Sequence, residues 1–224
     1  MSDILGKIYD FRRPDSLASK LRKKRFVLLK SLLESIPGPL KILDVGGTQT
    51  FWEKMDFLSQ EAGQVEITLF NINEIEVNHP QLKVVYGDAR DMKQFADREF
   101  DTVVSNSAIE HVGDFRDQMQ MANEIMRVGK RYFVQTPNLY FPIEPHFLFP
   151  FFQFLPLSVK VWLIQRFKLG WRGPVSDQVQ AIEAVDSIKL LSKQKLLSLF
   201  PNANLFEEKF FGLTKSLTVY DGWE

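Results

Sequence analysis

Residues 41–50, with the sequence Lys-Ile-Leu-Asp-Val-Gly-Gly-Thr-Gln-Thr, decide the fold of this chain. An apolar strand is predicted over 41–45, and a helix start at 51–52 follows the glycines. A strand that ends in a glycine turn presents backbone N–H groups at its carboxyl edge, where nucleotide-like ligands bind in open α/β sheets. Gly46 and Gly47 let the backbone approach such a ligand closely. The stretch predicts a cofactor site, and a turn needed for packing alone is the alternative.

Short apolar runs alternate with helical patterns over the next hundred residues. Further strands are expected at 65–71, 82–86, 101–105 and 131–135. The helix expected over 115–129 turns Met119, Ala122, Ile125 and Met126 inward and ends at Gly129. Alternation of this kind predicts a parallel sheet with helices on both faces.

The C-terminal residues change character. A helix is expected over 192–200, followed by two strand-like runs at 205–211 and 213–220 that are joined at Gly212. Because so short a link requires antiparallel pairing, these runs predict a terminal hairpin. The expected fold class is α/β, a Rossmann-like seven-stranded sheet that is mostly parallel with an antiparallel C-terminal hairpin.

Two other segments stand outside the predicted sheet. Residues 15–36 have a helical pattern, and we expect the basic cluster at 22–25 to be its solvated face. A basic patch for an anionic substrate or a membrane is the alternative. Residues 139–171 are rich in Phe and predict an aromatic cap after the fifth strand. The cap could complete the core, form an apolar acceptor pocket or lid, or rest on a membrane through 147–172.

The composition excludes several classes of function. The chain of 224 residues has 28 basic and 28 acidic side chains, and this balance argues against nucleic acid as a partner. The absence of cysteine excludes disulfides, thiolate zinc sites and cysteine nucleophiles. The first residues lack the charged and apolar regions of a signal peptide. A cytoplasmic location is therefore expected, with peripheral membrane contact as the alternative.

Polar residues and small residues follow four predicted strands at the point where each strand ends. These positions are Asp44, Gly46, Gly47 and Thr48, then Asn71, Ile72 and Asn73, then Gly87, Asp88 and Ala89, and finally Ser105, Asn106 and Ser107. Because the carboxyl ends of parallel strands share one edge of the sheet, one adenosine-sized ligand could meet all four groups. Ordinary turn chemistry is the alternative at each position.

At these residues the sequence resembles the class I methyltransferases that use S-adenosylmethionine. The segments that carry the resemblance are 42–47, 86–89, 100–112 and 132–138, with the sequences ILDVGG, YGDA, FDTVVSNSAIEHV and YFVQTPN. The third segment is similar to the fourth-strand motif of the small-molecule branch, the type 11 group. The terminal hairpin is similar to the last two strands of that fold.

The resemblance implies a role for each candidate cofactor residue. Asp44 would face the methionine amino group, directly or through water. Gly46 and Gly47 would pass under the methionine and ribose, and Asn71 would hold the ribose hydroxyls. Asp88 and Ala89 would read the adenine edge, and Ser105 and Asn106 would contribute backbone near the methionine end. The second strand of the family usually ends in Asp or Glu, so Asn73 or Glu74 is the alternative ribose ligand.

The candidate catalytic residues are His111, His146 and Glu144. His111 follows the fourth strand, where a packed role is the alternative, and His146 follows the fifth strand with Glu144 as its partner. No ligand spacing requires a metal, so none is expected. The expected reaction is in-line transfer of a methyl group from S-adenosylmethionine to a small, partly apolar or lipid-like acceptor, with O-methylation favoured.

Two rival functions remain. One is a non-catalytic binding module on the same fold, and the other is a nicotinamide-dependent oxidoreductase. The missing G-x-G-x-x-G argues against the oxidoreductase. We expect a single domain whose parts are an N-terminal helical segment (1–39), a cofactor-binding core (40–137), an aromatic cap or acceptor region (138–190) and a C-terminal helix with hairpin (191–224).

Overall fold

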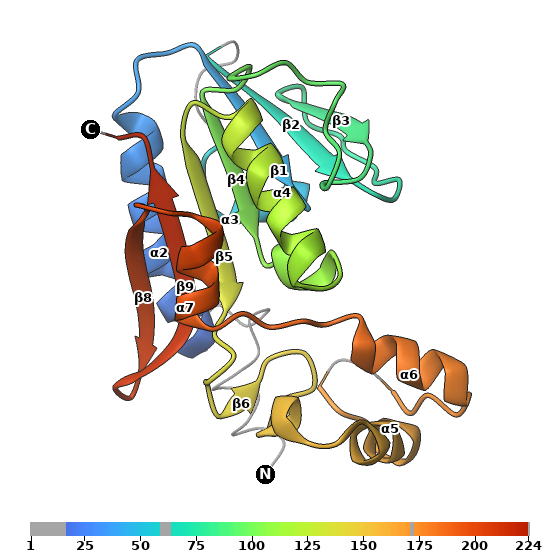
Figure 1. Cartoon of the computed structure of the whole chain (residues 1–224). Helices are drawn as coiled ribbons and strands as arrows, with labels where there is room; N and C mark the ends of the chain where they lie inside the picture. Colours follow the sequence, from blue (N-terminus) through green and yellow to red (C-terminus); the bar gives the residue numbers. More distant parts are fainter. Residues whose placement is uncertain (1–16, 59–63, 171–172, 224) are drawn as a thin grey trace.

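A seven-stranded sheet forms the centre of the computed structural model, which describes residues 17–58, 64–170 and 173–223 (Figure 1). Its strand order is β3-β2-β1-β4-β5-β9-β8. The strands are β1 (Leu40–Val45), β2 (Val65–Asn71), β3 (Leu82–Tyr86), β4 (Thr102–Asn106), β5 (Tyr132–Pro137), β8 (Asn204–Phe210) and β9 (Leu213–Asp221). The first five pair in parallel, whereas β9 is antiparallel to β5 and β8 is antiparallel to β9. The predicted fold class is confirmed, with strand ends within two residues of those expected.

Helices cover both faces of this sheet. Helices α4 (Phe115–Val128) and α7 (Lys193–Leu199) pack on one face, together with Leu43 of β1. Helices α2 (Leu17–Glu34) and α3 (Gln49–Lys54) pack on the other face, together with Ile42. Because side chains alternate along a strand, successive residues of β1 enter the two different cores. The first two residues of the expected N-terminal helix, 15 and 16, lie outside the described residues.

The buried face of helix α4 differs from the expected one by one residue. Asp114 caps the helix in a capping box with Asp117, and Gly129 follows its last turn. The buried stripe consists of Gln118, Met121, Ala122, Ile125 and Val128. The prediction that Met119 points inward is wrong, because Met119 lies one step off this stripe and is 44% exposed. Met121 occupies the core instead.

The aromatic segment forms a cap beyond the carboxyl end of β5 (Figure 1). Its elements are β6 (Ile143–Glu144), β7 (Phe149–Pro150), the short helix η2 (Phe152–Phe154), α5 (Leu157–Arg166) and α6 (Gln178–Asp186). The buried side chains of Phe147 and Phe152 pack with those of α5 and α6 in a small core of their own. Trp162 and Phe167 remain about half exposed on the cap. Over the described residues, no helix has the length and apolarity needed to cross a membrane.

The basic cluster of α2 is only partly solvated. Lys23 and Lys24 are exposed as expected, but Arg25 is 3% exposed. Its Nη1 donates to Oε2 of Glu208 on β8 at 3.2 Å. The prediction of a fully solvated basic face is therefore wrong at Arg25, because packing of α2 against the terminal hairpin covers this side chain.

Candidate active site

A cavity of about 290 Å³ lies at the carboxyl ends of β1 to β4, and we call it the cofactor cavity. Five of the ten residues predicted to bind a cofactor line this cavity, and so does His111. The five are Gly46, Asn71, Ile72, Asp88 and Ala89. The sheet edge predicted from the polar strand ends is thus the edge at which the structure has a cavity.

The turn after β1 approaches the start of η1 (Ile109–His111) closely. Gly46 has a φ of 77°, and a Cβ atom there would lie 2.5 Å from the Cβ of Ala108. Both the positive φ and this contact require glycine. The side-chain amide of Asn71 donates to the carbonyl of Gly47 at 3.0 Å. Asn71 therefore ties the end of β2 to this turn while it also lines the cavity.

Asp44 lies behind the turn and not among the described residues that line the cavity. It is 1% exposed, and its Oδ2 accepts a hydrogen bond from Nε1 of Trp52 at 2.7 Å. Burial raises the pKa of Asp44 to about 7. A Cβ atom on Gly47 would lie 1.9 Å from the same Oδ2. Asp44 and Gly47 therefore shape the turn from its buried side.

The remaining candidates after β1 and β4 also lie outside the cavity lining. Thr48 is exposed and precedes α3, and Ser105 is fully buried within β4. Ser107, which follows Asn106, lines the cavity instead. Its backbone φ is 56°, and its Oγ donates to Oε1 of Gln135 at 3.0 Å. Such backbone strain in a residue other than glycine is common at functional sites.

An ion pair that the sequence did not predict fixes Asp88. The guanidinium of Arg90 donates to both carboxylate oxygens of Asp88, with distances from 2.6 to 3.0 Å, and to Asp117 at 2.8 Å. The hydrogen bonds from Arg90 hold the pKa of Asp88 below its usual range. Asp88 is therefore an ionised acceptor at neutral pH, and Arg90 lines the cavity beside it.

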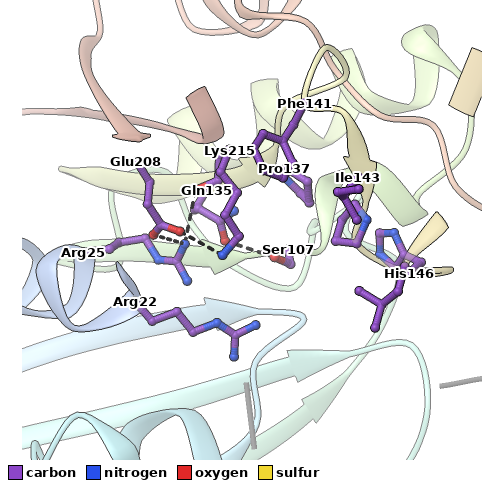
Figure 2. A pocket seen from close by; sticks show the side chains of 13 residues that line it. Arg22, Arg25, Ser107, Gln135, Pro137, Phe141, Ile143, His146, Glu208 and Lys215 are labelled. Carbon is purple, nitrogen blue, oxygen red and sulfur yellow. Dashed lines mark hydrogen bonds and ion pairs between the residues drawn. The ribbon is translucent and has the colours of Figure 1, made fainter. Parts of the chain in front are cut away.

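A second cavity of about 280 Å³ adjoins the first, and we call it the acceptor cavity (Figure 2). Ser107 lines both cavities. The apolar part of the wall comes from the end of β5 and from the cap, through Pro137, Phe141, Ile143, Pro145 and Leu148. Charged side chains of α2 and of the terminal hairpin form another part, and His146 also lines the cavity.

Glu144 fixes the orientation of His146. The Glu144 carboxylate is buried, and it accepts hydrogen bonds from the backbone N–H groups of His146 at 2.8 Å and Phe147 at 2.7 Å. Its Oε1 lies 2.6 Å from Nδ1 of the His146 ring. Because Nδ1 is engaged by this carboxylate, Nε2 is the ring nitrogen left to act as a base.

The two candidate catalytic histidines lie in contact at the boundary of the cavities. The ring centroids of His111 and His146 are 4.9 Å apart, with an angle of 88° between the rings. His111 lines the cofactor cavity and His146 lines the acceptor cavity. The structure thus brings together all three residues selected from the sequence, His111, His146 and Glu144. Their catalytic role stays a prediction.

Glu110 is the buried acidic residue beside the two histidines. It is fully buried, its Oε2 accepts a hydrogen bond from Oγ1 of Thr136 at 3.0 Å, and burial raises its pKa to about 7. Potential ligand atoms of Glu110, His111 and His146 lie within 4.8 Å of one another, a spacing that a metal ion could bridge. The expectation that no metal takes part stays a prediction.

Comparison with known proteins agrees with this geometry. Residues 49–132 match the family model described as a methyltransferase domain, type 11. A search of curated protein sequences found no match. Similar solved structures include an S-adenosylmethionine-dependent methyltransferase from Aquifex aeolicus, with 11% identity and a TM-score of 0.50 over 90% of this chain and 96% of that one.

Two further solved structures show the same fold. A methyltransferase of this cofactor class from Methanosarcina mazei has 13% identity and a TM-score of 0.50, covering 85% of this chain and 94% of its own. The PH0226 protein from Pyrococcus horikoshii has 16% identity and a TM-score of 0.50, covering 96% and 94%. At such identities these likenesses establish the fold alone.

The strand order and these neighbours show the fold of the class I S-adenosylmethionine-dependent methyltransferases, and residues 49–132 of the chain match a methyltransferase domain. Within that class, the matched family model is that of the type 11 branch, as the fourth-strand segment predicted. The cofactor of this class is S-adenosylmethionine.

Proposed function

We propose that this chain transfers a methyl group from S-adenosylmethionine in the cofactor cavity to a small, partly apolar acceptor in the acceptor cavity. The observation that carries the proposal is the boundary between the two cavities. Ser107 lines both of them, and the rings of His111 and His146 meet across it with centroids 4.9 Å apart. A donor and an acceptor held in these cavities would face each other at this boundary.

The residues of the cofactor cavity fit S-adenosylmethionine. Asp88 is an ionised acceptor for an amino or hydroxyl group, and Ile72 is an exposed apolar side chain on which an adenine ring can pack. Gly46 and Gly87 allow close packing around the cavity, because a Cβ atom would lie 2.5 Å from the Cβ of Ala108 at Gly46 and 2.6 Å from the ring of Phe70 at Gly87. We assign the binding of the cofactor to Gly46, Asn71, Ile72, Asp88 and Ala89.

When bound, S-adenosylmethionine would supply an electrophilic methyl group: a bond from the acceptor atom to this methyl would form as the bond from the methyl to sulfur breaks, with neutral S-adenosylhomocysteine as the leaving group. The contribution of the protein is to align the two reactants, which can lower the barrier by several kcal/mol. If the acceptor is a hydroxyl, as we propose, its proton must be removed. We assign the acceptance of that proton to Nε2 of His146, and the 2.6 Å distance between Nδ1 of the same ring and Oε1 of Glu144 supports this assignment.

A kinetic comparison of variants tests this assignment. The assay follows methyl transfer by mass spectrometry with a panel of hydroxyl and carboxyl acceptors, with and without EDTA. We expect His146→Gln to lower kcat by about 100-fold or more and to leave the affinity for S-adenosylhomocysteine unchanged. His79→Gln is the matched control, because His79 lies outside the described lining of both cavities.

The rival functions give different results in the same assay. Saturable binding of the cofactor without turnover on any acceptor would support the non-catalytic binding module. Equal turnover by the wild type and His146→Gln would remove His146 from the mechanism. Loss of activity in EDTA that added Mg²⁺ or Mn²⁺ restores would show that the cluster of Glu110, His111 and His146 binds a metal.

Peripheral membrane contact through 147–172 stays a prediction. Leu157, Trp162 and Phe167 are each about half exposed on the cap, which supports it. Binding to anionic vesicles that Trp162→Ala weakens would favour a lipid-like acceptor.

A further inference from the structure

The end of the acceptor cavity away from His146 is cationic (Figure 2). Arg22 and Arg25 of α2 and Lys215 of β9 line it, together with the carboxylate of Glu208 on β8. Nη1 of Arg25 lies 3.2 Å from Oε2 of Glu208, and Nζ of Lys215 lies 3.2 Å from its Oε1. One carboxylate is thus shared between two cations, and Arg22 brings further positive charge to the same wall.

This arrangement is unfavourable for a protein without a ligand. The side chains of Arg25 and Glu208 are less than 5% exposed, and that of Lys215 is 20% exposed. Burial is the main cause of the pKa shifts of the three cations. It lowers the pKa of Arg25 and of Lys215, and it lowers the pKa of Arg22 to about 10. A buried charge needs a partner of opposite sign. Among the described side chains that line this end of the cavity, three cations therefore face the single carboxylate of Glu208, and a carboxylate or phosphate of a ligand would add negative charge there.

The guanidinium of Arg25 also retains a hydrogen-bond donor that no described residue uses. The Nε atom of Arg25 is buried and has no hydrogen-bond partner among the described residues. Buried side-chain nitrogens are rarely left in this state. Guanidinium groups bind carboxylates and phosphates through two parallel hydrogen bonds, so Arg25 and Arg22 suit either anion.

The rest of the cavity wall defines the body of the ligand. Phe141 and Ile143 form an apolar surface on the wall of the same cavity, and Ser107 and His146 line it where it adjoins the cofactor cavity. A molecule that spans the cavity would meet positive charge at one end, apolar side chains in the middle and the imidazole of His146 at the other end.

We infer that the acceptor is an amphipathic anion whose carboxylate or phosphate binds to Arg22, Arg25 and Lys215. Its apolar body lies on Phe141 and Ile143, and its reactive group points toward Ser107 and His146. The inference rests on the proposed function for the identity of the ligand as the methyl acceptor. The anion site itself can be tested without any methyl transfer.

The experiment measures binding by calorimetry with two matched probes, 4-hydroxyphenylacetate and its neutral amide, in the presence of S-adenosylhomocysteine. Phenyl phosphate in a third arm distinguishes a phosphate site from a carboxylate site. We expect at least one of the two anions to bind more tightly than the amide. Lys215→Met should weaken binding of that anion by about tenfold, as expected for a hydrogen bond to a charged group, and should leave the affinity for the amide unchanged.

Lys193→Met is the matched control. Nζ of Lys193 pairs with Glu207, the neighbour of Glu208 on β8, at 2.6 Å, and it lies outside the described lining of the acceptor cavity. This variant should bind every probe as the wild type does. Glu208→Gln should have the opposite effect to Lys215→Met. Because it removes a negative charge from the cavity wall, it should strengthen binding of the anion. A thermal melt establishes that each variant is folded.

Equal affinity of both anions and the amide would overturn the inference, and so would anion binding that Lys215→Met leaves unchanged. Turnover on neutral acceptors without preference for anions would also overturn it while leaving the proposed function intact. Anion binding that follows the expected order of variants but gives no methylated product would support the anion site and count against the proposed function.

Discussion

Substitution of Gly47 by alanine should disrupt the turn after β1 through one defined contact. The new Cβ would lie 1.9 Å from Oδ2 of Asp44, so the carboxylate would have to move by more than about 1 Å to reach an ordinary contact distance. That movement breaks the 2.7 Å hydrogen bond from Trp52. Overpacking costs about 1–3 kcal/mol, and a buried polar group left without its partner costs about 1–3 kcal/mol more.

Urea unfolding followed by fluorescence measures this loss. We expect the free energy of unfolding of Gly47→Ala to fall by about 2–6 kcal/mol, which moves the midpoint by roughly 1–3 M urea for a chain of this size. Gly173→Ala is the control, because a Cβ at Gly173 meets nothing within 4 Å among the described residues. Its stability should change by less than about 1 kcal/mol.

A double-mutant cycle tests the mechanism of the loss. In an Asp44→Ala background the clashing carboxylate is absent, so Gly47→Ala should lower stability by less than about 1 kcal/mol. An equal loss in both backgrounds would refute the reasoning, since the contact with Asp44 would then not be its cause. Unchanged stability of the single variant would refute it as well.

Three further predictions concern pH, the cofactor cavity and α2. Burial raises the pKa of Asp44 in the folded protein to about 7, whereas its pKa in the unfolded chain is about 3.9. The protonated carboxyl therefore stabilises the folded state fully below about pH 3.9, and this stabilisation is lost as the pH rises through about 7. Between pH 5 and 7 the wild type should lose about 2 kcal/mol more than Asp44→Asn, as unfolding at each pH would measure. Asp88→Asn weakens the contacts with Arg90 and should reduce the affinity for S-adenosylhomocysteine by about tenfold in calorimetry; unchanged affinity would place the cofactor elsewhere. Trp223→Phe removes the 2.8 Å hydrogen bond to the carbonyl of Leu32 and should lower the free energy of unfolding by about 1 kcal/mol in urea; no change would mean that water replaces this bond.

Local sequence patterns predict the sheet well because strand formation here depends on short apolar runs. The runs at 65–71 and 82–86 match β2 and β3 residue for residue. The error at Met119 has a local cause as well. Methionines at 119, 121 and 126 fit more than one helical stripe, and only the packing of α4 on the sheet selects among them.

The site could be predicted only in part, because its remaining residues are buried by distant segments. Arg25 resembles its exposed neighbours in sequence, and its burial depends on Glu208, 183 residues away. The indole of Trp52 engages the carboxylate of Asp44 from the buried side, and the predicted contact of Asp44 with a ligand stays a prediction. Pairings such as these have no signal in any short stretch of sequence.

The two cavities draw on different parts of the chain. The cofactor cavity is built almost entirely from residues within the stretch 49–132 that matches the family model, together with the turn at Gly46. The charged wall of the acceptor cavity comes from α2 and the terminal hairpin, which both lie outside that stretch. If the acceptor binds in this cavity as we propose, replacing α2 and the hairpin by those of a related protein would change which charged group the acceptor can carry and would leave the binding of the methyl donor intact.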